Sequence, residues 1–410
     1  MPPSQKTDIL LVGRYLKAVE ALQERGRRVV NVVTPADLER LRHVPRHDLV
    51  VVADAGNAED VLAGLAREGM DPRDFAAVHS MREFTLVCAS LLAHVGGGAG
   101  VPVQTAVALR DKAVQKHLVR RAGLPAARCR VVDRPEDLLR DGRPGPEFPL
   151  VVKPLAGAGT RDTHLVAAPD ELPDLASRLG HGPWLVEEFV AGRELHLDGI
   201  VRDGRISFLA VSRYLRNVIS IKEGAAVGSV ALHPSANRAL YDRARSLASD
   251  ALDALGLRDG IFHLEAFEQP DRLVFSECAG RIGGGVIREC LAAAAGVDLL
   301  EEWAQVVLGL PATGSSWAQE SYGWINLATP SGPLVRLPGR EELLARPGCV
   351  AAGVDHDAAR GPLPPSSQSS NLRLGWALVA GPDEQTVAQR LGEVSAWFRA
   401  ACTDQAVVAA

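Results

Sequence analysis

Two glutamates stand on either side of a short turn in the segment HLEAFEQPDRLVFSECAGRIGGG, residues 263–285. Directly opposed carboxylates on neighbouring strands repel each other, so such a pair becomes useful when a divalent cation lies between them. Carboxylate oxygens that leave several coordination positions open suit Mg²⁺, which prefers a few carboxylates together with waters and nucleotide phosphates. We therefore interpret Glu265 and Glu277 as metal ligands. The alternative is an exposed hairpin with both glutamates in water, and the pair taken alone favours it.

The facing of the two glutamates depends on the register of the hairpin. A three-residue loop over residues 270–272 pairs Gln269 with Leu273 and puts Glu265 directly opposite Glu277. A loop one residue longer or shorter would send one carboxylate to the other side of the sheet. Three further side chains then share the face of the glutamates: His263, Phe267 and Phe275.

The residues that follow the second glutamate complete an anion site. Arg281 comes four positions later, and Gly283, Gly284 and Gly285 allow the backbone to approach a ligand closely. A metal, a guanidinium and exposed amides together bind an anion. His263 either touches phosphate or substrate at this site or is a packed strand histidine, and the sequence leaves both open.

A lysine and a glycine-rich loop form a second group in FPLVVKPLAGAGTRDTHLV, residues 148–166. Lys153 ends an apolar strand, where its charge is costly without a partner. The following AGAGT offers flexible amides and a hydroxyl, from Gly157, Gly159 and Thr160, as phosphate-covering loops do. The lysine precedes the glycines, so this is not a Walker loop. A hairpin loop with an edge lysine is the alternative.

A third group lies in WLVEEFVAGRELHLDG, residues 184–199. An apolar strand reaches Glu187 and continues into Phe189 and Val190, whose backbone could pair with an adenine edge. Glu194 is placed to accept from ribose hydroxyls. A strand with solvated acidic residues is the alternative for this stretch by itself.

Two kinds of sheet are expected to position these groups. Short β-branched runs at 8–13, 28–33 and 48–54 alternate with helical patterns at 14–25, 57–69 and 82–95. This alternation predicts a parallel α/β sheet. Asn57 or Asp54 is expected to cap the 57–69 helix, and Asp111 a later one. From residue 150 the pattern becomes rich in strands, with a helix over 236–256 and another near 383–400.

The overall composition narrows the class of protein. The chain has 410 residues, with 47% hydrophobic and 23% charged residues and a formal net charge of −5. That is ordinary globular composition, and the absence of a basic face or charge run argues against nucleic-acid binding. The six cysteines show no CxxC spacing, so a reducing cytoplasm fits best. The first residues lack the pattern of a signal peptide and no apolar run reaches membrane-spanning length, so a soluble cytoplasmic protein is expected.

The three groups, in this order, resemble the ATP-grasp superfamily of carboxylate–amine ligases over about residues 1–330. The resemblance implies that ATP phosphates are held by Lys112 (in RDK), Lys153 and the loop with Gly157, Gly159 and Thr160. It assigns adenine to Glu187 and the backbone around Phe189 and Val190, and ribose to Glu194. It assigns the metal to Glu265 and Glu277, and the substrate side to Arg281, Gly284, Gly285 and His263. Arg281 and Lys153 are the residues it implies for catalysis.

One position departs from the family pattern. Many members have an Asn two residues after the second glutamate as a further metal ligand, and this chain has Ala279 there. One metal site is therefore expected to rely on water or phosphate. The version E-x-A-x-R-x-G-G-G is closer to the L-amino-acid ligase branch, which makes dipeptides and related amides.

The resemblance implies an ATP-dependent ligase that forms an amide through an acyl phosphate and releases ADP and phosphate. Its expected cofactors are ATP and Mg²⁺ or Mn²⁺, and its expected substrates are a small carboxylate and an amine, with amino acids favoured. No nucleic-acid or membrane partner is expected, and a homodimer is compatible with the family. The alternatives are an ATP-grasp carboxylase or nucleotide-biosynthesis ligase, and a non-catalytic ATP-binding regulatory protein.

The expected fold class is α/β, with α+β character in the ATP-grasp part. The expected division is an N-terminal α/β domain over 1–105, an ATP-grasp lid over 106–185, an ATP-grasp core with the metal site over 186–330, and a C-terminal α+β segment over 331–410.

Overall fold

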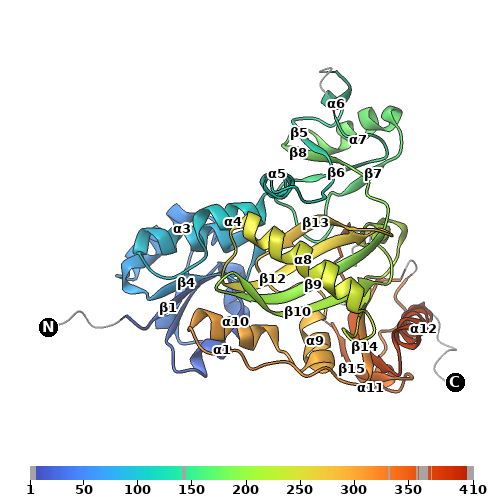
Figure 1. Ribbon diagram of the computed structural model, residues 1–410. Helices are drawn as coiled ribbons and strands as arrows, with labels where there is room; N and C mark the ends of the chain where they lie inside the picture. Colours follow the sequence, from blue (N-terminus) through green and yellow to red (C-terminus); the bar gives the residue numbers. More distant parts are fainter. Residues whose placement is uncertain are drawn as a thin grey trace.

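The computed structural model describes residues 6–140, 145–330, 333–356, 359, 368–370 and 372–403 (Figure 1). The described strands form three sheets, one parallel and N-terminal and two antiparallel. The predicted α/β class with a parallel sheet first is confirmed. None of the helices in this part of the chain is long and apolar enough to cross a membrane.

The N-terminal sheet has the strand order β3-β2-β1-β4. Its strands are β1 (Ile9–Val12), β2 (Val29–Val33), β3 (Leu49–Val51) and β4 (Ala77–His79), and its helices are α1 (Leu16–Gln23), α2 (Ala58–Arg67) and α3 (Leu86–Gly96). The strands are apolar apart from Asn31 and His79, because α1 covers one face of the sheet while α2 and α3 cover the other. The predicted cap is confirmed, since Asn57 Oδ1 accepts from the backbone N–H groups of Glu59 and Asp60 at the start of α2.

A small antiparallel sheet stands above the rest of the molecule (Figure 1). Its order is β5-β8-β6-β7, with β5 (Cys129–Val132), β6 (Leu150–Pro154), β7 (His164–Val166) and β8 (Trp184–Glu188). The helices around it are α5 (Lys112–Arg121), α6 (Asp137–Arg140) and α7 (Leu172–Leu179), and α4 (Val103–Arg110) precedes them. Asp111 caps α5 as predicted, accepting from the N–H groups of Ala113 and Val114.

The largest sheet has eight strands in the order β13-β12-β9-β10-β11-β14-β16-β15. They are β9 (Arg193–Arg202), β10 (Arg205–Tyr214), β11 (Gly228–Ala231), β12 (Gly260–Glu268), β13 (Leu273–Ala279), β14 (Ser321–Leu327), β15 (Cys349–Val354) and β16 (Gly375–Gly381). Its helices are α8 (Arg238–Leu255), α9 (Ile287–Ala295), α10 (Leu299–Val307), α11 (Arg340–Leu344) and α12 (Glu384–Thr403). The C-terminal strands thus extend the sheet that carries the predicted metal ligands. The division into domains given above stays a prediction.

Both faces of this sheet are covered by helices. α8 lies across one face and packs on Leu264, Phe262 and their neighbours, as its course over the strands in Figure 1 shows. α9 and α10 pack against the other face together with α1 of the N-terminal sheet.

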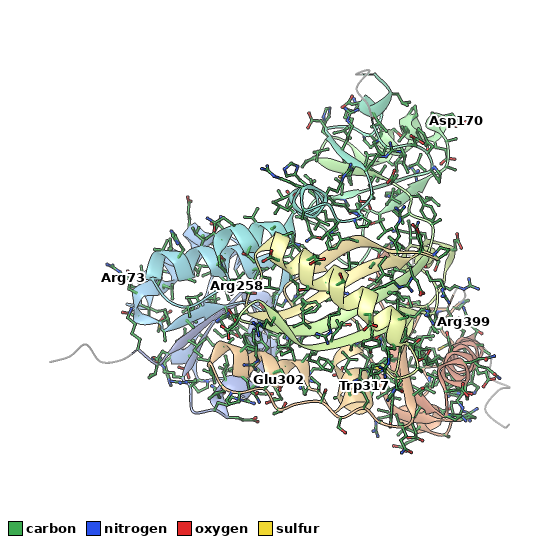
Figure 2. The ribbon with its side chains drawn as sticks, in the orientation of Figure 1. Arg73, Asp170, Arg258, Glu302, Trp317 and Arg399 are labelled. Carbon is green, nitrogen blue, oxygen red and sulfur yellow. The ribbon has the colours of Figure 1, made fainter. Side chains whose placement is uncertain are left out.

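Charged side chains lie on the surface of the molecule, as the exposed Arg73, Asp170, Arg258 and Arg399 illustrate (Figure 2). Short 3₁₀ helices complete the chain: η1 (Pro35–Leu41), η2 (Arg46–Asp48), η3 (Pro72–Asp74), η4 (Glu83–Thr85), η5 (Pro169–Glu171) and η6 (Val218–Glu223).

The turn of the β12–β13 hairpin differs from the prediction. Glu268 pairs with Leu273, where the three-residue loop required Gln269 to do so, and the loop is one residue longer than predicted. The shift by itself would turn one of the two glutamates to the other face.

A β-bulge reverses this shift before the glutamates are reached. Glu265 pairs with Glu277, as predicted, because Ser276 has no partner across the ladder. Between the bulge and the turn, the strands remain paired one position away from the predicted register. Phe275 pairs with Ala266 and is fully buried in the core, so the prediction that it shares the glutamates' face is wrong.

Candidate active site

One cavity of about 450 Å³ lies where the three sheets meet, and all of the predicted site residues line it. They are Lys112, Lys153, Gly157, Gly159, Thr160, Glu187, Phe189, Val190, Glu194, His263, Glu265, Glu277, Arg281, Gly284 and Gly285. The cavity also takes side chains from the N-terminal part, including Tyr15 and Glu83, and from β14, Trp324 and Asn326. Residues more than 200 positions apart in the chain thus converge on one space.

The two opposed glutamates lie on the floor of the cavity. Lys112 Nζ is 3.1 Å from Glu277 Oε2, and Tyr214 donates its hydroxyl to Glu265 Oε1 at 3.2 Å. Burial acts to raise the pKa of Glu277, but Lys112 and Lys153 outweigh it and lower the pKa to about 2. Glu277 is therefore ionised at neutral pH. Two carboxylates facing each other across adjacent strands are a donor set that fits Mg²⁺.

A buried carboxylate between two lysines lies beside this pair. Glu187 Oε1 is 2.6 Å from Lys153 Nζ, and its Oε2 is 2.9 Å from Lys116 Nζ. Burial acts to lower the pKa of Lys153, but Glu187 and Glu277 raise it above the ordinary value. Burial lowers the pKa of Lys116, and for Glu187 the two lysines outweigh burial and lower the pKa. The carboxylate of Glu187 is thus engaged by both lysines, and its backbone is paired with Cys129 on β5 and Val151 on β6, so the predicted contact of Glu187 with adenine stays a prediction.

The glycine-rich loop after β6 has backbone conformations that favour close approach. Gly159, Thr160 and Asp162 have φ values of 67°, 57° and 51°, in the left-handed region that a β-branched residue such as Thr seldom adopts. Lys112 Nζ donates to Gly157 O at 3.0 Å, and Ser370 N donates to Gly159 O at 3.0 Å. The loop is thus held by contacts from Lys112 and Ser370, which belong to other parts of the chain.

Glu194 occupies a buried position near the metal ligands. It accepts from the backbone N–H of Val218 at 2.6 Å, and its own N–H donates to Asn217 Oδ1 at 3.0 Å. Burial, together with the charge of Glu265, raises the pKa of Glu194 to about 8. This carboxyl therefore carries a proton at neutral pH in the ligand-free protein.

The raised pKa predicts how stability varies with pH. The unfolded carboxyl of Glu194 loses its proton near pH 4.5 and the folded one near pH 8, so the folded state binds more protons in this window. The stabilisation is complete below the lower value and is lost as pH rises through the upper one. The Tm of the ligand-free protein should therefore fall by a few degrees between about pH 5 and about pH 8.5, and the fall should be smaller in Glu194→Gln. Scanning calorimetry checks this, with the exposed Glu341→Gln as control, and equal slopes in all three proteins would contradict it.

The arginine and the glycines lie together at the far end of the cavity. Arg281 donates from Nε to Glu83 and from Nη1 to Ile282 O at 2.8 Å, and its Nη2 makes no hydrogen bond to any described residue. Gly283 needs to be glycine because a Cβ there would lie 2.6 Å from His263 Nδ1. Gly285, at φ +72°, lies directly under the ring of Trp324. Arg281 and the three glycines thus line the same cavity as Glu265 and Glu277, the predicted metal ligands.

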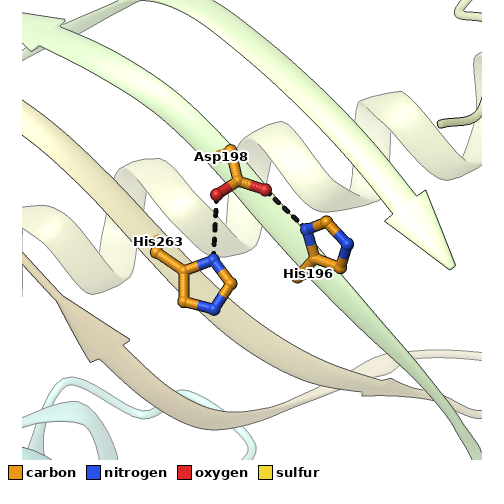
Figure 3. Close-up of side chains that lie close together, drawn as sticks. All are labelled: His196, Asp198 and His263. Atoms are coloured by element: carbon orange, nitrogen blue, oxygen red, sulfur yellow. Dashed lines mark hydrogen bonds and ion pairs between the residues drawn. The ribbon is translucent and has the colours of Figure 1, made fainter. Parts of the chain in front are cut away.

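A buried polar network is formed by His196, Asp198 and His263 (Figure 3). Asp198 lies 2.5 Å from His196 Nδ1 and 2.9 Å from His263 Nδ1, and His196 Nε2 is 2.8 Å from Ser229 Oγ. His263 Nε2 is 3.5 Å from Glu265 Oε1. These donor atoms lie close enough together to hold a metal ion, but the hydrogen bonds among them already satisfy them. His263 is thus packed in a strand and also lines the cavity, and its contact with phosphate or substrate stays a prediction.

Several residues of the cavity were not predicted from the sequence. Lys116 follows Lys112 by four positions on one helix, and this spacing is the signal that could have indicated it. Glu83, Trp324 and Asn326 come from distant elements and carry no local signal. Asp198 is buried and lies outside the cavity lining, and its alternation with His196 along the ELHLDG strand is the signal that the two side chains share a face.

Comparison with known proteins agrees with this geometry. Residues 117–284 match the family model described as the ATP-grasp domain. A curated relative, the L-arginine-specific L-amino acid ligase of Bacillus subtilis, is 26% identical over 263 residues, which are 62% of this chain and 63% of the relative. The aligned part thus spans less than two thirds of that relative's length.

Two solved structures share the fold over nearly the whole chain. An L-amino acid ligase from Bacillus licheniformis superposes with a TM-score of 0.75 at 16% identity, covering 96% of this chain and 98% of that one. A carboxyaminoimidazole ribonucleotide synthase from Aspergillus clavatus, complexed with ATP, gives a TM-score of 0.74 at 18% identity, covering 96% and 100%. The resemblance drawn from the sequence motifs is thus confirmed over residues 117–284, which match the ATP-grasp domain.

Proposed function

We propose that the protein is an ATP-dependent ligase that joins the carboxylate of an amino acid to an amine, through an acyl phosphate, with release of ADP and phosphate. The observation that carries the proposal is the content of one cavity: a pair of opposed carboxylates, two lysines, a glycine-rich loop and an arginine with an unused Nη2. Each part suits a different portion of the same reaction.

The nucleotide half of the cavity would hold ATP. Adenine would lie against the backbone of Phe189 and Val190, and the ribose beside Glu194. Lys112 and Lys153 would contact the phosphates while the glycine-rich loop covers them, so that catalysis rests on placement and electrostatics. Mg²⁺, held by Glu265 and Glu277, would neutralise charge on the transferring phosphoryl group.

The substrate half would hold the acid and then its activated form. An oxygen of the substrate carboxylate attacks the γ-phosphorus, the bond to ADP breaks, and an acyl phosphate results. Arg281 and the amides of Gly284 and Gly285 would bind the new acyl phosphate, which their place in the cavity lining supports. The amine then attacks the acyl carbon, phosphate leaves, and the amine gives up a proton. The closed loop keeps water from the acyl phosphate, which would otherwise hydrolyse.

The names of the relatives support amino acids as substrates. The curated relative and one of the solved structures are L-amino acid ligases. The competing candidate is a ligase of nucleotide biosynthesis, because the carboxyaminoimidazole ribonucleotide synthase shares the fold about equally well. A purely regulatory ATP-binding protein would not need the metal carboxylates and Arg281 in one cavity.

The test is an ADP-release assay with ATP and Mg²⁺ over pairs of amino acids and small amines, with mass spectrometry of the products. ADP release that needs both partners, with the mass of a new amide, is the expected result. Bicarbonate with an aminoimidazole nucleotide is included as the competing pair, and turnover with that pair alone would replace the proposal. Tight ATP binding without ADP release from any pair would favour the regulatory protein.

A further inference from the structure

We propose that Glu83 is a positioning residue that ties Arg281 to the glycine-rich loop and so protects the acyl phosphate from water. The inference rests on the proposed function and deepens it. Glu83 lies in η4 of the N-terminal part, outside the ATP-grasp domain, and none of the three sequence groups includes it.

The carboxylate of Glu83 is shared by two guanidinium groups. Its Oε1 accepts from Arg110 Nη1 at 2.6 Å, and its Oε2 accepts from Arg281 Nε. The Glu83 side chain is only 12% exposed and that of Arg110 10%, so these contacts are shielded from solvent. A buried carboxylate with charge-assisted bonds to two arginines fixes both side chains.

The second guanidinium reaches the glycine-rich loop. Arg110 Nη2 donates to the carbonyl of Ala156 at 2.6 Å, at the start of the loop. Its guanidinium also lies over the ring of Phe84, 5.0 Å from the centroid, and Arg161 at the end of the loop lies 5.9 Å from the same centroid. Glu83 and Phe84 therefore contact both ends of the loop, directly or through Arg110.

The first guanidinium is held in the orientation that an anion requires. Glu83 accepts from Nε of Arg281 and the carbonyl of Ile282 accepts from Nη1, while Nη2 has no hydrogen bond to a described residue and Arg281 lines the cavity. The guanidinium groups of Arg110 and Arg281 carry two positive charges and the carboxylate of Glu83 one negative charge, so the three side chains together have a net positive charge that attracts an anionic intermediate. Without Glu83, Arg281 can rotate about its side-chain bonds, and Arg110 loses the carboxylate that holds it against the loop. Both changes admit water to the acyl phosphate.

The test measures coupling in Glu83→Gln, with the amino acid pair on which the wild type is most active. The wild type should release about as much ADP as it forms amide. In the variant we expect the ratio of ADP to amide to rise roughly tenfold, because small misplacements of reacting groups cost large rate factors. Glu301→Gln is the matched control, since Glu301 pairs with Arg25 at 2.7 Å at another contact between the N-terminal part and the core. Its ratio should stay at the wild-type value.

A second variant serves if Glu83→Gln does not fold. Arg110→Lys keeps the positive charge but loses the guanidinium that donates to both Glu83 and Ala156, so it should also raise the ratio of ADP to amide.

Hydrogen exchange supplies a readout that does not depend on turnover. With a non-hydrolysable ATP analogue, residues 155–163 should exchange faster in Glu83→Gln than in the wild type and in Glu301→Gln.

Two outcomes of the coupling measurement would overturn the inference. If the ratio of ADP to amide stays unchanged while the rates of ADP release and amide formation fall together, Glu83 has a merely structural role. An unchanged ratio with a raised KM for one amino acid would overturn it as well, and would make Glu83 a substrate contact. If the wild type forms no amide from any pair, the proposed function fails instead, and unchanged exchange over 155–163 would then refute the role of Glu83 separately.

Discussion

Replacing Glu277 with Gln should lower the rate of ADP release by about 1,000-fold or more at saturating ATP. Losing a single group that stabilises transition-state charge costs roughly 100- to 1,000-fold in other enzymes, and here the metal ligand and the partner of Lys112 are lost together. The lowered pKa of Glu277 means that the substitution removes a full negative charge. Gln keeps the size of the side chain, so the hairpin should still form.

The control for this variant is Asp271→Asn, which removes one exposed carboxylate from the turn of the same hairpin. It should retain the wild-type rate, and both variants should show similar Tm values. Titration with Mg²⁺ should give a much weaker dependence in Glu277→Gln than in the wild type. A rate within about tenfold of the wild type at ordinary Mg²⁺ would contradict the role of Glu277 as a metal ligand.

Replacing Lys153 with Met should weaken the binding of ATP by about 100-fold, which corresponds to roughly 2.7 kcal/mol. Lys153 is the residue before the end of strand β6, lines the cavity and is buried with Glu187, so its charge would act on phosphate with little screening. Met has a similar length and apolar stem. Glu187 keeps Lys116 as partner, so no unpaired buried charge is created and the fold should persist.

Isothermal titration with a non-hydrolysable ATP analogue measures this effect. The matched control is Lys17→Met, because Lys17 is an exposed lysine whose nearest carboxylate, Glu289, is 3.7 Å away. Lys17→Met should bind the analogue like the wild type. If Lys153→Met also bound within about threefold of the wild type, Lys153 would be a partner of Glu187 only, and the phosphates would lie elsewhere.

The parts of the site that could be predicted are those with local signals. A strand reveals which side chains share a face through its alternation, so the facing of Glu265 and Glu277 could be predicted from two short segments. Asn57 and Asp111 were predictable as caps for the same reason, since a cap depends on the next three residues.

The hairpin shows the limit of this reasoning. The turn was predicted one residue too short and the bulge at Ser276 was not foreseen, and the two errors cancelled at Glu277 but not at Phe275. A bulge is chosen by packing on both faces of the sheet, which no short segment contains.

The remaining residues depend on contacts between distant parts of the chain. Glu83 is 198 positions from Arg281, and Asn326 reaches the cavity because β14 pairs with β11. Lys116 was overlooked because a lysine on a helix is usually solvated, whereas here it is fully buried beside Glu187.

The central claim is that the substrate carboxylate becomes an acyl phosphate in this cavity. The most direct test uses an amino acid whose carboxylate oxygens are labelled with oxygen-18, together with ATP, Mg²⁺ and the amine on which the wild type is most active. Attack of the carboxylate on the γ-phosphorus transfers one labelled oxygen to phosphate for each amide formed, and mass spectrometry of the released phosphate should detect it. Amide formation with unlabelled phosphate, or with AMP and diphosphate in place of ADP, would contradict the account.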